Sequence, residues 1–156
     1  MMIKVALSIS APRAAVWGVI TDFDNVVNVI SGINKVEVLE RPEQGLVGLK
    51  WQETRTLFGQ TATEEMWITE YAENEFYKTR AESHGAVYIS TIAVVDEQNG
   101  SCLSMTFSSQ PQTWVAKVLS LPMGFLCKNA TKKALLQDLK DIKSAVEQPP
   151  QDSGNT

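Results

Sequence analysis

Between Ile33 and Ser109 the sequence alternates apolar and polar residues, and short turn signals interrupt this alternation. Period-two alternation is typical of half-buried strands, and Gly- or Asn-containing pairs between such runs predict hairpins. The turn signals are Glu43-Gln44-Gly45, Phe58-Gly59, Glu73-Asn74, His84-Gly85 and Asn99-Gly100. We expect a type I′ turn at the last of them, because Asn and Gly both tolerate positive φ. Strands connected by hairpins pair with their neighbours, so the region predicts six consecutive antiparallel strands.

The segments on either side of this region supply one more strand and the helices. Residues 3–9 alternate in the same way and predict a first strand, and residues 12–20 and 22–29 predict two short helices. Beyond Pro111 the apolar spacing becomes helical, is interrupted at Pro122 and Gly124, and continues in a longer helix. Only that helix is long enough to cover the sheet. The predicted fold class is α+β: a seven-stranded antiparallel sheet wrapped around a long C-terminal helix, with two short helices between the first and second strands.

Length and charge exclude several classes of protein. A chain of 156 residues fits a single domain, which we place at residues 1–147, followed by a flexible polar tail at 148–156. The net charge of −4 and the lack of a basic run argue against nucleic-acid binding. No segment is long and apolar enough to cross a bilayer, so we expect a cytoplasmic protein without integral membrane contact. The oligomeric state stays open, a homodimer included.

The cysteines and the histidine exclude several kinds of catalytic or metal site. Cys102 and Cys127 lack metal-type spacing, and we expect both thiols to be reduced, one outward on a strand and one on the helix. His84 is the only histidine, so a multi-histidine metal site cannot form, and we expect no catalytic triad. No metal and no cofactor are expected.

The turn positions determine which side chains share a face of the sheet. A tight turn at Phe58-Gly59 pairs Glu53 with Glu64. The next hairpin places Tyr77 beside Glu70 and Arg80 over an outward Trp67, as a cation–π contact. Following the remaining turns, the inner face carries Trp51, Glu53, Arg55, Glu64, Met66, Tyr77, Thr79, Tyr88, Ser90, Met105 and Phe107.

This inner face combines large apolar side chains with ionisable ones. Burying unpaired charges costs several kcal/mol, so a closed core would not normally hold Glu53, Arg55 and Glu64 at adjacent positions. The helix opposite offers the small residues Cys127, Ala130, Thr131 and Ala134. Together they favour a partly wet cavity over a closed core. We predict that the cavity lining, and thus the ligand-binding residues, are the eleven inner-face residues above with Cys127, Thr131 and Ala134.

Three motifs resemble a known superfamily. Ile9-Ser10-Ala11-Pro12 with Val16-Trp17 and Thr21-Asp22 resembles the opening of SRPBCC proteins, the START-related and birch-pollen-allergen-like superfamily that includes the polyketide cyclase/dehydrase-like group. Residues 47–55 look like that group's third strand, and residues 138–147 are similar to the end of its closing helix. The resemblance implies a helix-grip fold around a cavity for a hydrophobic or amphipathic ligand. It also implies gating hairpins, here at Phe58, Gly59, His84 and Gly85.

Three functions are compatible with these features. The first is binding, for transport or sensing, of a small hydrophobic ligand. The second is a cyclase or dehydratase that uses Glu53 or Glu64 with Arg55 or Tyr88, acting on a polyketide-like or aromatic substrate in the same cavity. The third is a protein-interaction module that uses a sheet edge or the outer face around Trp67.

Arg55 lies diagonal to Glu64 and can neutralise it, so the cluster of Glu53, Arg55 and Glu64 is either a ligand anchor or a salt bridge that holds the hairpin. The break at Pro122-Gly124 is either a moving lid or a fixed kink.

Overall fold

The structure, a computed structural model, describes residues 2–57, 59–83, 85–111 and 114–148. A first strand and two short helices open the chain, six strands follow, and a long helix closes it. The elements are β1 (Met2–Ile9), α1 (Arg13–Ile20), α2 (Val26–Val29), β2 (Ile33–Glu40), β3 (Lys50–Leu57), β4 (Gln60–Ala72), β5 (Phe76–Ser83), β6 (Ala86–Glu97), β7 (Gly100–Pro111) and α3 (Trp114–Glu147). The predicted element order is confirmed.

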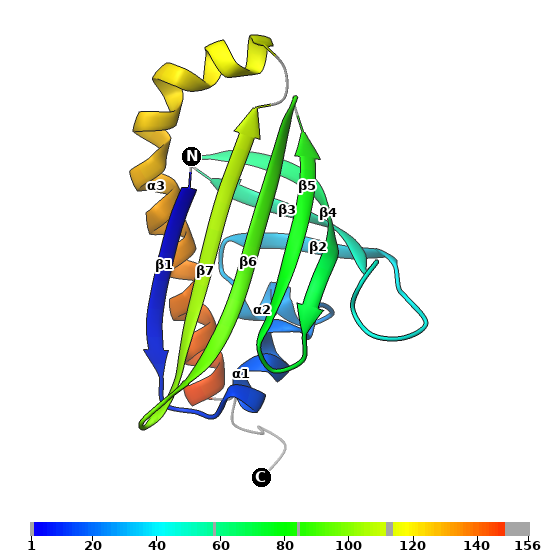
Figure 1. Ribbon diagram of the computed structural model, residues 1–156, viewed down its shortest axis with the longest axis vertical. Helices are drawn as coiled ribbons and strands as arrows, with labels where there is room; N and C mark the ends of the chain where they lie inside the picture. Colours follow the sequence, from blue (N-terminus) through cyan, green and yellow to red (C-terminus); the bar gives the residue numbers. More distant parts are fainter. Residues whose placement is uncertain (1, 58, 84, 112–113, 149–156) are drawn as a thin grey trace.

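All strands belong to one antiparallel sheet. The strand order is β1-β7-β6-β5-β4-β3-β2, so β1 closes against the last strand and β2 forms the other edge. Figure 1 shows β2 and β3 running almost across the direction of β1 and β7, which makes the sheet strongly curved, and α3 lies along its concave side. Such curvature follows from the right-handed twist accumulated over successive strands. The predicted fold class, a sheet wrapped around the C-terminal helix, is confirmed.

The main hydrophobic core lies at the end of the sheet where α1 and the C-terminal half of α3 pack together. Leu103 of β7 and Leu139 of α3 are completely buried, and Val16, Ile9 and Ile142 complete the contact. Burying side chains of this size stabilises the fold by about 1.5–3 kcal/mol each. The core thus anchors one end of α3, while the middle of the concave face is left for other side chains.

The pairing of β3 with β4 is as predicted. Glu53 lies opposite Glu64 and Trp51 opposite Met66. The β4–β5 hairpin departs from the prediction near its turn, where Tyr77 pairs with Tyr71 instead of Glu70. The turn has one residue more than expected, and a bulge between Ile68 and Glu70 restores the register further along the strands. Tyr77 still faces inward.

Two further details differ from the sequence-based expectations. The β6–β7 turn lies one residue early, with Gln98 and Asn99 between the paired Glu97 and Gly100, so the type I′ turn at Asn99-Gly100 is wrong. Gly100 is needed for another reason, because a Cβ atom there would collide with the Ile9 carbonyl oxygen. On the outer face, Arg80 pairs with Glu82.

The predicted cation–π contact of Arg80 with Trp67 is therefore wrong. Lys50 instead lies over the Trp67 ring, with its Nζ atom 5.7 Å from the ring centroid. Lys50 and Arg80 both lie directly opposite Trp67, on the two strands beside it, but the Arg80 guanidinium is turned toward the carboxylate of Glu82 on its own strand. Arg80 makes two charge-assisted hydrogen bonds to Glu82, and bonds of this kind are among the stronger contacts at a surface.

Helix α3 runs without interruption from Trp114 to Glu147, so the expected break at Pro122-Gly124 does not end the helix. Figure 1 shows instead that the first turns of α3 bend away from its main axis, which is the usual effect of an internal proline. None of the described helices combines the length and apolar character needed to span a membrane. Cys102, outward on β7, is in no disulfide, and the side chain of Cys127 lies outside the described residues.

Candidate functional site

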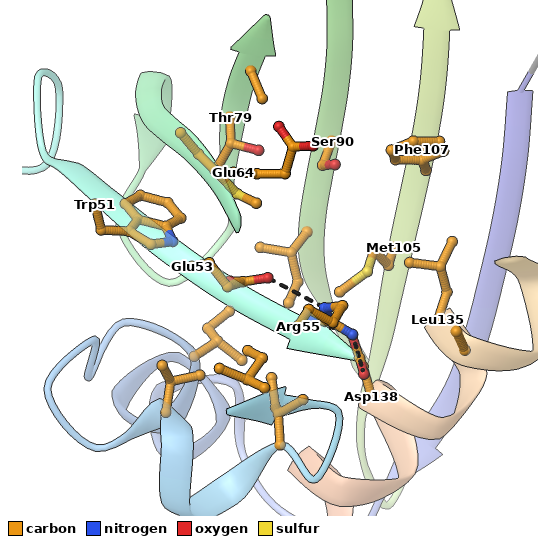
Figure 2. A pocket seen from close by; sticks show the side chains of 18 of the residues that line it. Trp51, Glu53, Arg55, Glu64, Thr79, Ser90, Met105, Phe107, Leu135 and Asp138 are labelled. Atoms are coloured by element: carbon orange, nitrogen blue, oxygen red, sulfur yellow. Dashed lines mark hydrogen bonds and ion pairs between the residues drawn. The ribbon is translucent and has the colours of Figure 1, made fainter. Parts of the chain in front are cut away.

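A pocket of about 450 Å³ lies between the concave face of the sheet, the helices α1 and α2, and α3. Its lining is mostly apolar, with a few polar side chains on β3 to β6 (Figure 2). Every residue predicted to face a ligand lines this pocket except Cys127, whose side chain lies outside the described residues. The structure thus brings the predicted set together, and the role of its members in binding a ligand stays a prediction.

Two of the predicted gate residues, Gly59 and Gly85, lie in hairpin turns. Gly59 and Gly85 occupy the β3–β4 and β5–β6 turns with φ of 75° and 76°, a conformation that glycine adopts without strain. Phe58 and His84 lie outside the described residues. Both hairpins have the predicted position, and a gating role stays a prediction.

One wall of the pocket is aromatic. The ring of Phe23, which follows α1, lies 4.7 Å from that of Trp51 and 5.7 Å from that of Tyr77, measured between centroids. Trp17 of α1 meets Tyr77 edge-on at 6.2 Å. Such offset and edge-to-face pairs each add about 0.5–1.5 kcal/mol beyond the burial of their area. This wall is therefore a rigid surface of the pocket.

The helical side of the pocket contains residues that the strand pattern could not identify. Around α1, α2 and the start of β2, the apolar lining that was missed consists, besides Phe23, of Val19, Ile20, Val26, Val29, Ile30 and Ile33. Val19 and Ile20 belong to the predicted first helix, but nothing in the sequence indicates where that helix docks.

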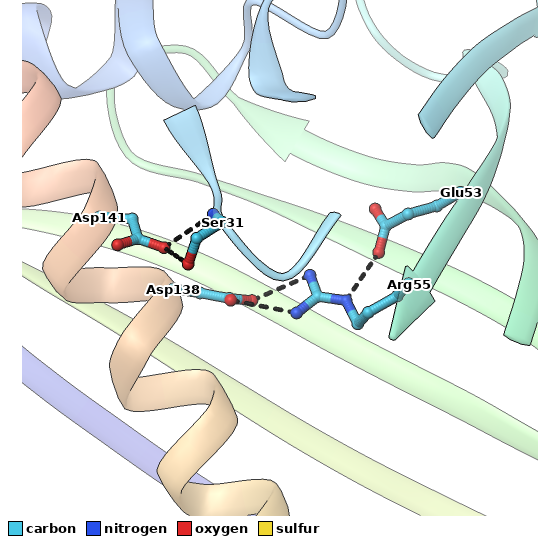
Figure 3. A network of polar contacts seen from close by, with 5 residues as sticks. All are labelled: Ser31, Glu53, Arg55, Asp138 and Asp141. Atoms are coloured by element: carbon cyan, nitrogen blue, oxygen red, sulfur yellow. Dashed lines mark hydrogen bonds and ion pairs between the residues drawn. The ribbon is translucent and has the colours of Figure 1, made fainter. Parts of the chain in front are cut away.

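Arg55 joins the sheet to α3 at the centre of the pocket (Figure 3). Its Nε atom donates to Glu53 at 3.2 Å, and its two terminal nitrogens donate to the two oxygens of Asp138 at 3.0 Å each. Within the predicted cluster, Arg55 therefore pairs with Glu53. The expected neutralisation of Glu64 is wrong, because Arg55 turns toward the helix, where Asp138 offers a bidentate, more buried partner.

Burial governs the electrostatics of this network. The side chains of Arg55, Glu53 and Asp138 are 19%, 13% and 5% exposed. Burial raises the pKa of Asp138, and Arg55 only partly offsets this effect. Burial acts to lower the pKa of Arg55, but the charges of Asp138 and Glu53 outweigh it and the pKa is raised. The guanidinium is therefore held in its charged form.

Asp138 was missed as a site residue, although the sequence contains a signal for it. It lies three residues after Leu135 and four before Ile142, inside the apolar stripe of α3. A carboxylate on a buried helix face needs a partner, and Arg55 is that partner. Next to it, Asp141 accepts hydrogen bonds from the backbone N–H and the hydroxyl of Ser31 at 2.9 and 2.8 Å, which ties the loop before β2 to α3 (Figure 3).

Glu64 is the charged side chain of the described pocket lining that has no ion-pair partner. It is half-buried, and no residue in the part of the chain that the structure describes donates a hydrogen bond to it or forms an ion pair with it. Figure 2 shows Glu64, Thr79 and Ser90 on β4, β5 and β6, pointing into the same part of the pocket. Burial, and then the charge of Glu64, raises the pKa of Tyr88, which keeps its phenol protonated. This end of the pocket can both accept and donate hydrogen bonds.

Residues 2–147 match a family model described as polyketide cyclase / dehydrase and lipid transport. The chain belongs to this family. The resemblance to the polyketide cyclase/dehydrase-like group of SRPBCC proteins is thereby confirmed. A comparison with curated proteins found no match.

Solved structures share the fold of this polyketide cyclase/dehydrase family member. A protein from Thermus thermophilus aligns with a TM-score of 0.77 at 14% identity, over 94% of this chain and 97% of its own. A START superfamily protein from Mycobacterium smegmatis gives 0.77 at 16%, over 96% and 99%. The Zhui aromatase/cyclase from Streptomyces sp. R1128 gives 0.73 at 13%, over 100% and 99%. At these identities the similarity supports the helix-grip fold and no particular ligand.

In this family member, Tyr77 should make the folded protein less stable at alkaline pH. Its hydroxyl donates to the Ile20 carbonyl at 3.3 Å, and burial, then the charge of Glu53, raises its pKa well above the ordinary value of 10.0. The unfolded chain therefore loses this proton first, and stability falls as the pH rises above about 10. We expect wild type to be more stable than Tyr77→Phe by about 1 kcal/mol at pH 8.

By about pH 11 that advantage should vanish, because linkage through Tyr77 removes about 1.4 kcal/mol from wild type alone. Urea unfolding of both proteins across this pH range measures the difference. A constant gap between the two proteins from pH 8 to pH 11 would contradict the raised pKa.

Proposed function

We propose that the protein binds a small hydrophobic or amphipathic molecule in the pocket between the sheet and α3, for transport or sensing. The observation that carries this proposal is the pocket itself. Its volume of about 450 Å³ falls in the range of roughly 300–1,000 Å³ that small-molecule sites occupy. Its lining combines a continuous apolar surface with a few polar groups at one end, which suits a ligand with one apolar and one polar part.

A cavity of this size is larger than the voids left by ordinary side-chain packing. Protein interiors are packed as densely as organic crystals, and voids larger than a water molecule are few. The walls of this pocket are held apart by defined contacts: the Arg55–Asp138 ion pair between β3 and α3, and the Ser31–Asp141 hydrogen bonds. Surrounding groups therefore do not collapse into the space, and a ligand can supply the dispersion contacts that its lining lacks.

A neutral apolar dye tests the proposal directly. N-phenyl-1-naphthylamine should bind saturably with one site per chain, and its emission should increase and shift to the blue as it enters the pocket. Native mass spectrometry of protein purified without detergent should show a small-molecule adduct that disappears on denaturation. Urea-unfolded protein is the control for non-specific dye uptake. A titration without saturation, together with an adduct-free spectrum, would reject a binding function.

A second candidate is a cyclase or dehydratase acting in the same pocket. It is favoured by the presence on one wall of the Glu64 carboxylate and the protonated Tyr88 phenol, a base and an acid. Glu53 and Arg55 are less suited to catalysis, because they already pair with each other and Arg55 also pairs with Asp138. If this function is correct, the protein turns over a linear polyketone substrate. Glu64→Gln should then lower the turnover rate by a factor of about 100 or more while dye binding persists.

Nothing in the described residues favours the third candidate, a protein-interaction module. Trp67 on the outer face is half-buried and covered by Lys50. The exposed large apolar residues are dispersed over β1, α2, β2, the β2–β3 loop and β6. Scattered apolar residues of this kind are normal on a monomer surface.

A further inference from the structure

Acidic side chains outnumber basic ones among the described residues that line the pocket. Among the described lining residues there are three carboxylates, on Glu53, Glu64 and Asp138, and one guanidinium, on Arg55. The pocket therefore presents more negative than positive charge to a ligand. Because its walls are largely apolar, this charge acts at a lower effective dielectric constant than it would at the surface.

The single cation is already occupied. Arg55 uses Nε for Glu53 and both terminal nitrogens for Asp138, so three of its five N–H donors are engaged with carboxylates. An anionic ligand would have to compete with both partners in a network less than one fifth exposed. Leaving either carboxylate unpaired there is unfavourable. The pocket is thus poorly suited to fatty acids and other carboxylates.

Glu64 is in the opposite situation. It faces Glu53 across the β3–β4 ladder. Arg55, the cation of the pocket, pairs with Glu53 and Asp138 and not with Glu64. Lys50 lies on the outer face, where it pairs with Glu65 at 2.7 Å. Thr79, Ser90 and Tyr88 bring only hydroxyl groups to this end of the pocket. The Glu64 carboxylate consequently has acceptor capacity that the described residues leave unused.

We propose that the ligand is an apolar molecule with a protonated amine, and that this amine pairs with Glu64 while the apolar body fills the space against the aromatic wall. The hydroxyls of Thr79, Ser90 and Tyr88 would accept the remaining ammonium hydrogens. This inference rests on the proposed binding function and specifies the chemical class of its ligand.

Three naphthalene compounds with the same ring and different polar groups test the inference. These are 2-(1-naphthyl)ethylamine, 2-(1-naphthyl)ethanol and 1-naphthylacetate, titrated into wild-type protein at neutral pH by calorimetry. The amine should bind about tenfold more tightly than the alcohol, because a charge-assisted hydrogen bond is roughly twice as strong as a neutral one. The carboxylate should bind more weakly than the alcohol.

Variants at two adjacent positions separate the pocket from general charge. Glu64→Gln should reduce the affinity for the amine about tenfold, since an amide carries no charge. The affinities of the three compounds should then be similar. Glu65→Gln makes the same change in net charge on the outer face and should leave all three affinities unaltered. Circular dichroism and thermal unfolding verify that both variants are folded, and the wild-type ranking stands without them.

The outcomes distinguish the inference from the proposed function. If the dye and the naphthyl alcohol bind but the amine has no advantage over the carboxylate, the ligand class is wrong and the binding function stands. If Glu65→Gln weakens the amine as much as Glu64→Gln does, the effect is general electrostatics and the inference is overturned. If the dye and all three compounds fail to bind, both proposals are overturned.

Discussion

Replacing Arg55 with methionine is expected to lower the free energy of unfolding by about 3–5 kcal/mol. Methionine keeps much of the side-chain bulk but leaves Glu53 and Asp138 as buried carboxylates without a cation. Their side chains are only 13% and 5% exposed, so water cannot replace the guanidinium. A loss of this size is a large share of the roughly 5–15 kcal/mol that holds a domain together. Urea unfolding followed by tryptophan fluorescence measures it.

The chain offers a matched control on the same sheet. Arg80 also pairs with a glutamate two residues away, Glu82 at 2.7 Å, but their side chains are 39% and 54% exposed. Arg80→Met should cost no more than about 1 kcal/mol, as for other surface ion pairs. Adding Asp138→Leu to Arg55→Met should recover part of the loss, because it removes one unpaired buried charge. Equal costs for Arg55→Met and Arg80→Met would show that the network is not a structural link.

The sheet could be predicted in detail because strand faces depend only on parity. A two-residue turn at Phe58-Gly59 is enough to place Glu53 opposite Glu64 and to send Trp51 and Met66 to the same side. Even the unexpected bulge after Ile68 did not change which residues face the pocket. Its extra residue compensates for the longer turn at Asn74, whose φ of 63° lies in the left-handed region. The length of the turn and the position of the bulge depend on local backbone geometry, which the alternation of apolar residues does not predict.

Apart from Thr131 and Ala134, the helical residues of the site could not be predicted from the sequence pattern. Parity relates neighbours within a sheet, so it could relate Arg55 to Glu64, but it contains no information on how α3 is rotated above β3. That rotation places Asp138 over Arg55, and it is set by packing of the neighbouring Leu139 and Ile142 in the core. Docking of α1, which brings Phe23 against Trp51, depends on side-chain shape in the same way.

A ring introduced at Ala134 should abolish dye binding without unfolding the protein. Ala134 is a half-buried residue on α3, and its small side chain lines the pocket beside Leu135 and Asp138. In Ala134→Phe the phenyl group would enter the space that a ligand needs. We expect the affinity for N-phenyl-1-naphthylamine to fall at least about tenfold. The Tm should shift by no more than about 4 °C, because an added ring in open space displaces nothing.

Lys133→Phe is the matched control, since it adds the same ring at the neighbouring, exposed position of α3. It should leave dye affinity unchanged. Two results would count against the pocket as a binding site. Destabilisation of Ala134→Phe by about 1–3 kcal/mol, the ordinary cost of overpacking a core, would mean that the space is closed in solution. Undiminished dye binding by a folded Ala134→Phe would place the dye elsewhere on the protein, because a ring at position 134 and a ligand in the pocket must compete for the same volume.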